Sequence, residues 1–288
     1  MKALLRLSTH LRLWKVLVLL SVVLLFQGCA CEGLNDVEES TKSEPSILSE
    51  AVSEEDNDGG DNSLVFPEWS NRDIEPLEFK LPDTAPQPSS MVKPKKPHLQ
   101  KVLSFTPARG ATHGHEKFPK RIQGPPQGLG ERKGSLDVVS LGCGGSIILE
   151  FSQPLIGNGP GPDFIIFENA FSYGGVETFA EPAEVSVSVD GKKWYAFPCR
   201  PKDNPWPFPQ CAGVKPVYSS SESGIDPKDP DKAGGDAFDL EDLGLPFVRF
   251  IKIVDKSMDN PDSASWCGQY NAGFDLDAVT VLWSYQPK

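Results

Sequence analysis

Short runs of β-branched and aromatic residues, separated by clusters of Gly, Pro, Asp and Asn, recur along the last 187 residues of the chain. Val185, Val187 and Val189 alternate with serines, which is the period of a half-buried strand. Asp190 and Gly191 follow directly, and this dipeptide is typical of a hairpin turn. The runs that we expect to form strands are 102–105, 136–141, 146–151, 164–167, 184–189, 194–197, 247–254 and 278–284.

This pattern predicts an all-β domain over residues 102–288, with the antiparallel β-sandwich of a jelly roll as its architecture. The run 164–167 is apolar on both faces, so we expect it to be a central strand. We find no amphipathic stretch of three helical turns. One turn of helix is expected at 240–243, closed by Gly244.

The first 28 residues carry a targeting signal. Lys2, Arg6, Arg12 and Lys15 precede the apolar run 16–26, which is shorter than the ~20 residues that a membrane-spanning helix needs. This pattern predicts a secretory signal peptide over residues 1–28. The sequence Leu-Phe-Gln-Gly-Cys at 25–29 resembles a bacterial lipobox, which implies that Cys29 carries a lipid. An ordinary signal peptide followed by a chance cysteine is the alternative.

Residues 29–101 are expected to form a disordered tether between the lipid and the domain. Residues 30–62 contain eleven acids and one base, and residues 63–101 are rich in proline. Such composition cannot bury enough apolar surface to fold. The formal net charge of the whole chain is −12, and most of it lies in this segment. An acidic chain of this kind is not expected to bind nucleic acid, which requires clustered Lys and Arg.

Several blocks carry a family resemblance. GSLDVVSLG at 134–142, GPGPDFIIFENAF at 159–171 and FDLDAV at 274–279 resemble a largely uncharacterised family of bacterial cell-surface lipoproteins. The hairpin VSVSVDGKKWY at 185–195 and the later VRFIKI at 248–253 are also similar to discoidin and galactose-binding-like jelly rolls. These resemblances imply a non-catalytic surface module, often supported by calcium and sometimes glycan-binding. The residue after Cys29 is Ala30 and not Asp, and by resemblance to the lipoprotein sorting rule of diderm bacteria this implies the outer membrane.

Six cysteines are present, and five remain if Cys29 is lipidated. Cys199 and Cys211 bracket a Pro-rich loop, so we expect them to form a disulfide, which persists in an exported protein. Cys143 and Cys267 both adjoin Gly-rich strand ends, and they form either a second disulfide or two buried thiols. A zinc site is disfavoured because the chain has no CxxC motif.

Carboxylates gather at predicted strand ends, and they suggest a cation site. Asp275 and Asp277 lie two apart, so on a strand they would project from one face. We expect Asp275, Asp277, Glu168 and Asp239 to bind one structural Ca²⁺, which takes six to eight oxygen ligands. The alternative is that these aspartates accept backbone N–H groups in Asx-type turns.

The residues suggest two further candidate functions, glycan binding and glycan hydrolysis. Exposed rings can stack on sugars, which makes Trp206, Phe208 and Tyr270 candidate glycan-binding residues, unless the rings fold onto the edge of the domain. Glu168 with a partner Asp could instead form a glycosidase pair. The sequence therefore predicts a lipid-anchored module on the bacterial outer membrane or cell surface, which binds carbohydrate or another envelope component. A surface glycan hydrolase and a purely structural envelope lipoprotein are the alternatives.

Overall fold

The computed structural model describes residues 91–98, 101–108, 111–152, 155–173, 177–203, 206–264, 266–267 and 272–286. All of them belong to one compact unit, Ser63–Lys288. The predicted signal peptide over 1–28, the lipid-bearing Cys29 and nearly all of the predicted tether lie outside the described residues.

The largest sheet has five strands, all antiparallel, in the order β10-β9-β13-β4-β2. Its members are β10 (Tyr195–Ala196), β9 (Ala183–Ser188), β13 (Phe250–Asp255), β4 (Ser146–Glu150) and β2 (Lys101–Thr106). The central strand β13 pairs along its whole length with β9 on one side and through five of its six residues with β4 on the other. The predicted hairpin joins β9 to β10, and the Asp190 carboxylate accepts the backbone N–H groups of Lys192 and Lys193.

Smaller antiparallel sheets complete the domain. One has the order β1-β16-β5-β12 and another the order β11-β6-β15, while β14 pairs with β3 and β7 with β8. Their bounds are β1 (Met91–Val92), β16 (Ser284–Tyr285), β5 (Leu155–Gly157), β12 (Phe247–Val248), β11 (Asp236–Phe238), β6 (Phe164–Phe167), β15 (Ala278–Val281), β14 (Asp275–Leu276), β3 (Val139–Ser140), β7 (Phe171–Tyr173) and β8 (Glu177–Phe179). Strand β6 is central in its sheet and fully buried, as its apolar sequence predicts.

Helical segments in the described residues are short. They are the 3₁₀ turns His115–Lys117, Lys120–Ile122, Leu240–Leu243 and Ser257–Asp259, and the helix α2 (Pro261–Ala264). The predicted turn at Leu240–Leu243 is confirmed, and Gly244 ends it in the left-handed conformation with a φ of 62°.

No helix in the described part of the chain is long and apolar enough to cross a membrane.

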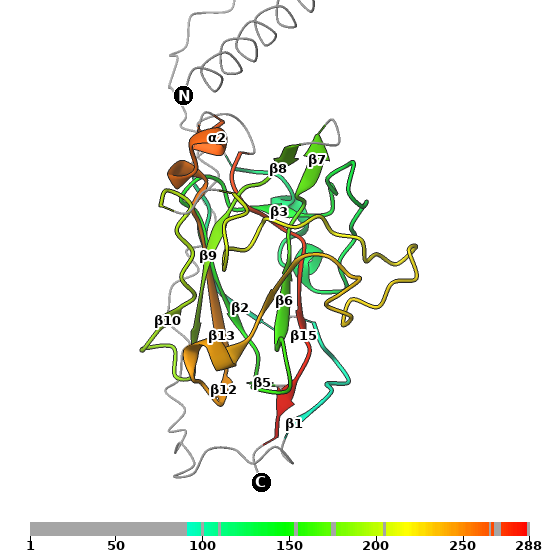
Figure 1. The fold of residues 1–288 in the computed structure, drawn as a ribbon, viewed down its shortest axis with the longest axis vertical. Coiled ribbons are helices and arrows are strands. Elements are labelled where there is room, and N and C mark those ends of the chain that lie inside the picture. Colours follow the sequence, from blue (N-terminus) through cyan, green and yellow to red (C-terminus); the bar gives the residue numbers. More distant parts are fainter. Residues whose placement is uncertain are drawn as a thin grey trace, which may run out of the picture. The chain divides into compact units, whose positions relative to one another are not determined.

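Two sheets contribute to one hydrophobic core. Ile251 and Ile253 of β13 are fully buried, whereas Lys252 between them reaches the surface. They belong to the same core cluster as Phe164 and Ile166 of β6. Figure 1 shows β13 and β9 on one side of the domain and β6 and β15 on the other. The prediction of an all-β, antiparallel domain is therefore confirmed.

The ordered structure begins before residue 102. Strand β1 pairs with β16, and the N–H of Val281 donates to the carbonyl of Pro97. The stretch 91–98 contains three lysines and two prolines, which is not a strand-like composition. Its place in the fold comes from pairing with the C-terminal strands, which sequence periodicity does not reveal.

Two disulfides close loops of very different length. Cys199 pairs with Cys211 across 12 residues, and Cys143 pairs with Cys267 across 124 residues. The predicted Cys199–Cys211 disulfide is confirmed. Of the two states left open for Cys143 and Cys267, the structure shows the disulfide.

Removing each disulfide should destabilise the domain by an amount that follows loop length. Loop-closure entropy gives about 3 kcal/mol for the shorter loop and about 5 kcal/mol for the longer one. We expect the Cys143→Ser/Cys267→Ser double variant to lose more unfolding free energy than Cys199→Ser/Cys211→Ser. Urea denaturation under oxidising conditions measures both, and each double variant is the control for the other. The reverse order would contradict the loop-length argument.

Candidate functional site

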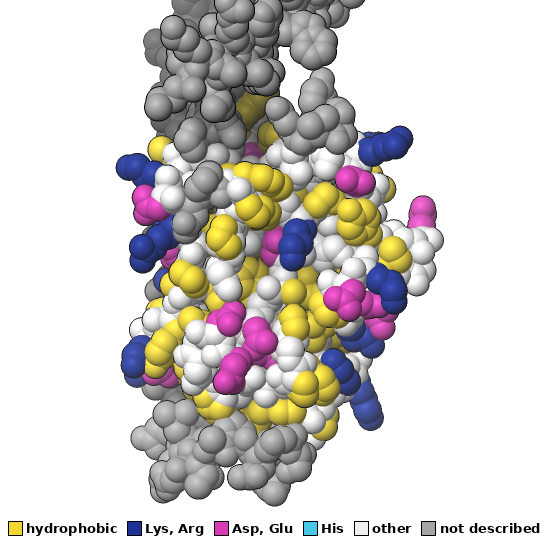
Figure 2. All heavy atoms as spheres, in the orientation of Figure 1, with side chains coloured by type: hydrophobic (Ala, Val, Ile, Leu, Met, Phe, Trp, Pro, Cys, Tyr) yellow, Lys and Arg dark blue, Asp and Glu magenta, His cyan; other side chains and the backbone are white. Residues whose placement is uncertain are grey.

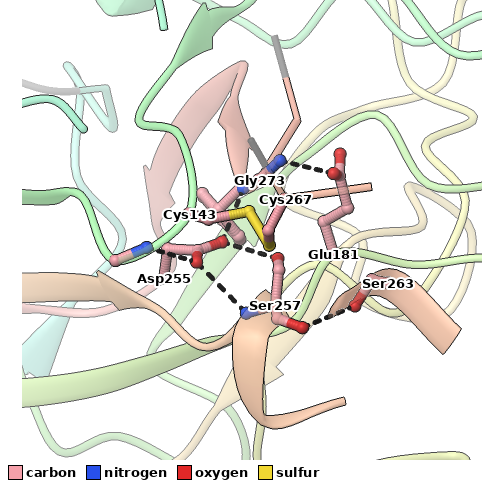
Figure 3. Close-up of a disulfide and its surroundings, with 9 residues drawn as sticks. Cys143, Glu181, Asp255, Ser257, Ser263, Cys267 and Gly273 are labelled. Carbon is pink, nitrogen blue, oxygen red and sulfur yellow. Dashed lines mark hydrogen bonds between the residues drawn. A yellow bond between two sulfur atoms is a disulfide. The ribbon is translucent and has the colours of Figure 1, made fainter. Parts of the chain in front are cut away.

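A group of buried carboxylates lies near the Cys143–Cys267 disulfide. Asp255, the last residue of β13, accepts the N–H groups of Gly144, Ser257 and Phe274, at 2.7, 3.1 and 2.8 Å. It also accepts the hydroxyl of Ser257 at 2.6 Å. Figure 3 shows these bonds converging on Asp255 beside the disulfide. Asp255 thus fixes three chain segments, and its oxygens are occupied by donors.

Glu181 lies on the other side of the disulfide in Figure 3 and precedes β9. One of its carboxylate oxygens accepts the N–H of Gly273. Burial raises the pKa of Glu181 to about 8, and repulsion from Asp275 and Asp255 acts in the same direction. The N–H of Gly273 offsets only part of this rise, so the charged form is poorly stabilised.

Glu168 follows β6 and is only 1% exposed. Neither of its carboxylate oxygens has a hydrogen-bond partner of acceptable geometry. Burial raises its pKa well above the ordinary value, and repulsion from Glu181 and Asp275 adds to the rise. The N–H groups of Asn169 and Ala170 oppose this shift only in part.

Asp275 of β14 is the third member of this group. The Asn169 amide donates to its Oδ2 at 3.2 Å, whereas its Oδ1 is buried without a partner. Burial raises the pKa of Asp275 to about 6, against the Ser140 hydroxyl and the charge of His113, which both lower it. We call Glu168, Glu181 and Asp275 the carboxylate cluster.

Asp277 has a different partner from Asp275, and we do not include it in the carboxylate cluster. Its carboxylate accepts the N–H of Gln127 at 2.8 Å, and burial raises its pKa to about 8. The chain changes partner strand at this position, because Asp275 pairs with Ser140 of β3 and Ala278 pairs with β6. The alternation of a continuous strand is therefore lost between the two aspartates.

Asp239 also lies elsewhere, which corrects its assignment to the same site as Glu168. It caps the turn Leu240–Leu243 by accepting the N–H of Glu241 at 2.9 Å. It acts electrostatically on Asp163, whose carboxylate accepts the N–H groups of Gly159 and Leu240. The Asx-type role weighed for Asp239 is the one that the structure shows.

Among the described residues, no three His, Cys, Asp or Glu side chains are already arranged to hold a metal ion. The set Asp275, Asp277, Glu168 and Asp239 is thus not a preformed calcium site.

The three predicted glycan-binding residues differ in position. Trp206 is 48% exposed and makes an edge contact with Phe208, with ring centroids 5.5 Å apart. Phe208 itself is 5% exposed and packs with the Cys199–Cys211 disulfide. Phe208 therefore supports the loop and cannot stack on a ligand, which corrects its predicted role. Tyr270 lies outside the described residues.

Two carboxylates of this region, Glu181 and Asp255, were not predicted. Glu181 and Asp255 both lie at strand ends in apolar sequence, the same signal that identified Glu168. Trp266 is also 48% exposed, and it contacts Phe179, which stacks on Phe171 of the neighbouring strand. Figure 2 shows one face of the domain, where hydrophobic side chains are interspersed with acidic and basic ones.

No protein-family model matches the chain, and no curated protein is significantly similar to it. The family resemblance of the sequence blocks stays a prediction.

The free energy of unfolding should fall as pH rises from 5 to 8, and Asp163 should account for part of the fall. Burial raises the pKa of Asp163 to about 7 from its ordinary value of 3.8. Its contribution is complete below the unfolded pKa and is lost as pH rises through the folded one. Urea denaturation of wild type and Asp163→Asn at pH 5 and pH 8, in EDTA, measures the slope.

Asp163→Asn should show a smaller fall than the wild type. Asp190→Asn is the control, because the N–H groups of Lys193 and Lys192 lower the pKa of Asp190 below this range. That variant should keep the wild-type slope. Equal slopes for the wild type and Asp163→Asn would contradict the prediction.

Proposed function

We propose that this chain is a lipid-anchored bacterial cell-surface protein, whose C-terminal domain is a non-catalytic jelly-roll sandwich that binds a glycan. The observation that carries the proposal is Trp206. It is a large ring, about half exposed, on a loop anchored by a buried disulfide and the buried Phe208. Aromatic rings supply large contact area, and a rigid support reduces the entropy lost on binding.

The anchoring of the loop supports a binding role. Cys199, Phe208 and Cys211 pack with Ala180 and Val214 in one buried cluster. The neighbouring Ala212 pairs with Ala183 at the start of β9. Trp206 therefore projects from a loop that is fixed on the domain by packing, by a covalent bond and by backbone pairing.

Two disulfides support an extracytoplasmic location. Such bonds form and persist in oxidising compartments and are rare in the reducing cytosol. This agrees with a signal peptide over residues 1–28 and a lipid on Cys29, and it favours the outer membrane or the cell surface as the destination.

The position of Glu168 favours binding over glycan hydrolysis. A glycosidase acid must reach the glycosidic oxygen, and its partner carboxylate must lie on the other side of the sugar ring. Glu168 is buried and faces other carboxylates, so a polymer cannot approach it in this structure. We therefore do not assign it a catalytic role.

Replacing Trp206 should abolish most of the binding without unfolding the domain. Loss of a central aromatic contact costs about 2 kcal/mol, or roughly thirtyfold in affinity. The full chain is tested on a glycan array and against peptidoglycan and lipopolysaccharide, with the melting temperature measured in parallel. Trp206→Ala should weaken binding and leave the melting temperature within about 1 °C, because the ring is half exposed.

Trp266→Ala is the matched control, because the two rings have the same exposed fraction. It should bind like the wild type. Loss of binding in Trp266→Ala but not in Trp206→Ala would move the binding surface to Trp266 and overturn the assignment. An absence of binding to every glycan probe would contradict the proposed function.

The lipid anchor is tested separately by labelling cells of a diderm bacterium with radioactive palmitate. The wild-type chain should incorporate label and fractionate with the outer membrane. Cys29→Ser should lose the label, whereas Cys31→Ser, two residues away, should keep it. An unlabelled wild type would show that residues 1–28 are an ordinary signal peptide.

A further inference from the structure

The carboxylate cluster contains a buried acid that has no partner. Most buried polar groups in proteins accept or donate at least one hydrogen bond, and the exceptions require a physical explanation. Both oxygens of Glu168 are buried without a partner, and so is Oδ1 of Asp275. Three carboxylate oxygens in one region are therefore unsatisfied by the described residues.

The surroundings of Glu168 make its charge more unfavourable. The charged side chains that raise the pKa of Glu168 are Glu181 and Asp275, both of the same sign. None of the ion pairs that the structure describes includes a member of the carboxylate cluster. Like charges in a buried site are stabilised by a proton or by a cation between them.

Asp255 differs from the carboxylate cluster in its hydrogen bonding. It is also buried, but it accepts three backbone N–H groups and one hydroxyl. Nearby donors therefore satisfy Asp255, whereas neither oxygen of Glu168 has a partner of acceptable geometry. Asp255 has a structural role, and the unsatisfied oxygens point to a ligand.

We propose that Glu168, Glu181 and Asp275 bind one divalent cation, and that Ca²⁺ is the ion that fits them best. The three side chains come from three separate segments: the residue after β6, the loop before β9, and β14. This site differs from the set expected from the sequence, because Asp277 and Asp239 are replaced by Glu181. It does not depend on the glycan-binding function proposed above.

The choice of ion follows from the donors. The unsatisfied atoms of the carboxylate cluster are all oxygens. Ca²⁺ accepts six to eight oxygens in flexible geometry, whereas Mg²⁺ demands a near-ideal octahedron. The sulfurs of Cys143 and Cys267 are joined to each other, so they are not thiolate ligands for zinc. The side chains do not yet form a ready metal group. Glu168 makes no hydrogen bond of acceptable geometry that would compete with an ion for its oxygens.

The test is thermal unfolding of the full chain at pH 7.5, after treatment with EDTA, with and without added CaCl₂. An ion that binds only the folded state should raise the melting temperature by about 5–10 °C at roughly 100 times Kd. Calorimetric titration should give one Ca²⁺ per chain. Glu168→Gln should lose the Ca²⁺-induced shift, because its neutral amide removes one charge and one ligand oxygen.

Asp277→Asn is the matched control, because Asp277 is equally buried and lies two residues from Asp275 but accepts Gln127 instead. It should keep the full shift. If Glu168→Gln does not fold, Asp275→Asn takes its place, with the metal content of purified wild type measured by mass spectrometry. No shift in the wild type, or a full shift in a folded Glu168→Gln, would overturn the site. An equal shift with MgCl₂ would overturn the choice of Ca²⁺.

Discussion

Buried aspartates that accept backbone N–H groups hold this domain together where its strands end. Many described strands are two or three residues long, so long connecting segments must be fixed by other means. Asp163 binds Gly159 and Leu240, and Asp236 binds the N–H groups of Val214 and Lys215. A charged acceptor makes a stronger hydrogen bond than a neutral one. These carboxylates position the loops on which the rest of the structure depends.

Burial disfavours the charged form of these carboxylates, and hydrogen bonds compensate for this to different degrees. Removal from water raises the pKa of Asp163 to about 7 and that of Asp236 to about 6, although both accept backbone N–H groups. Neither oxygen of Glu168 has a hydrogen-bond partner of acceptable geometry, and the like charges of Glu181 and Asp275 act on it. Asp163 and Asp236 therefore fix loops through hydrogen bonds, whereas the carboxylate of Glu168 is the basis of the proposed cation site.

One short segment connects the two candidate sites. Ala180 packs in one cluster with Phe208, whose ring contacts Trp206, and the next residue, Glu181, belongs to the carboxylate cluster. Ala183 then begins β9 and pairs with Ala212, next to the disulfide of the aromatic loop. The carboxylate cluster and the support of the loop that carries Trp206 therefore include adjacent residues, Glu181 and Ala180.

Sequence periodicity was sufficient for the regular part of the fold. Alternation of Val and Ser identified β9, and an unbroken apolar run identified β6, because side-chain burial in a sheet repeats every two residues. Strand β1 was missed, because a two-residue strand forms through pairing with a distant segment. The residue types of the candidate site were also visible, since acids at strand ends are a local feature.

By itself, the sequence determined an antiparallel all-β domain, the hairpin at Asp190, the turn that Gly244 ends, and the Cys199–Cys211 disulfide. Only the tertiary structure decided which carboxylates meet. Asp275 and Asp277 contact different segments, through Asn169 and Gln127, and the chain changes its partner strand between them. Glu181 joins Glu168 although they lie in different segments. The physical reason is that local periodicity sets which face a side chain occupies, whereas long-range strand pairing sets which faces come together.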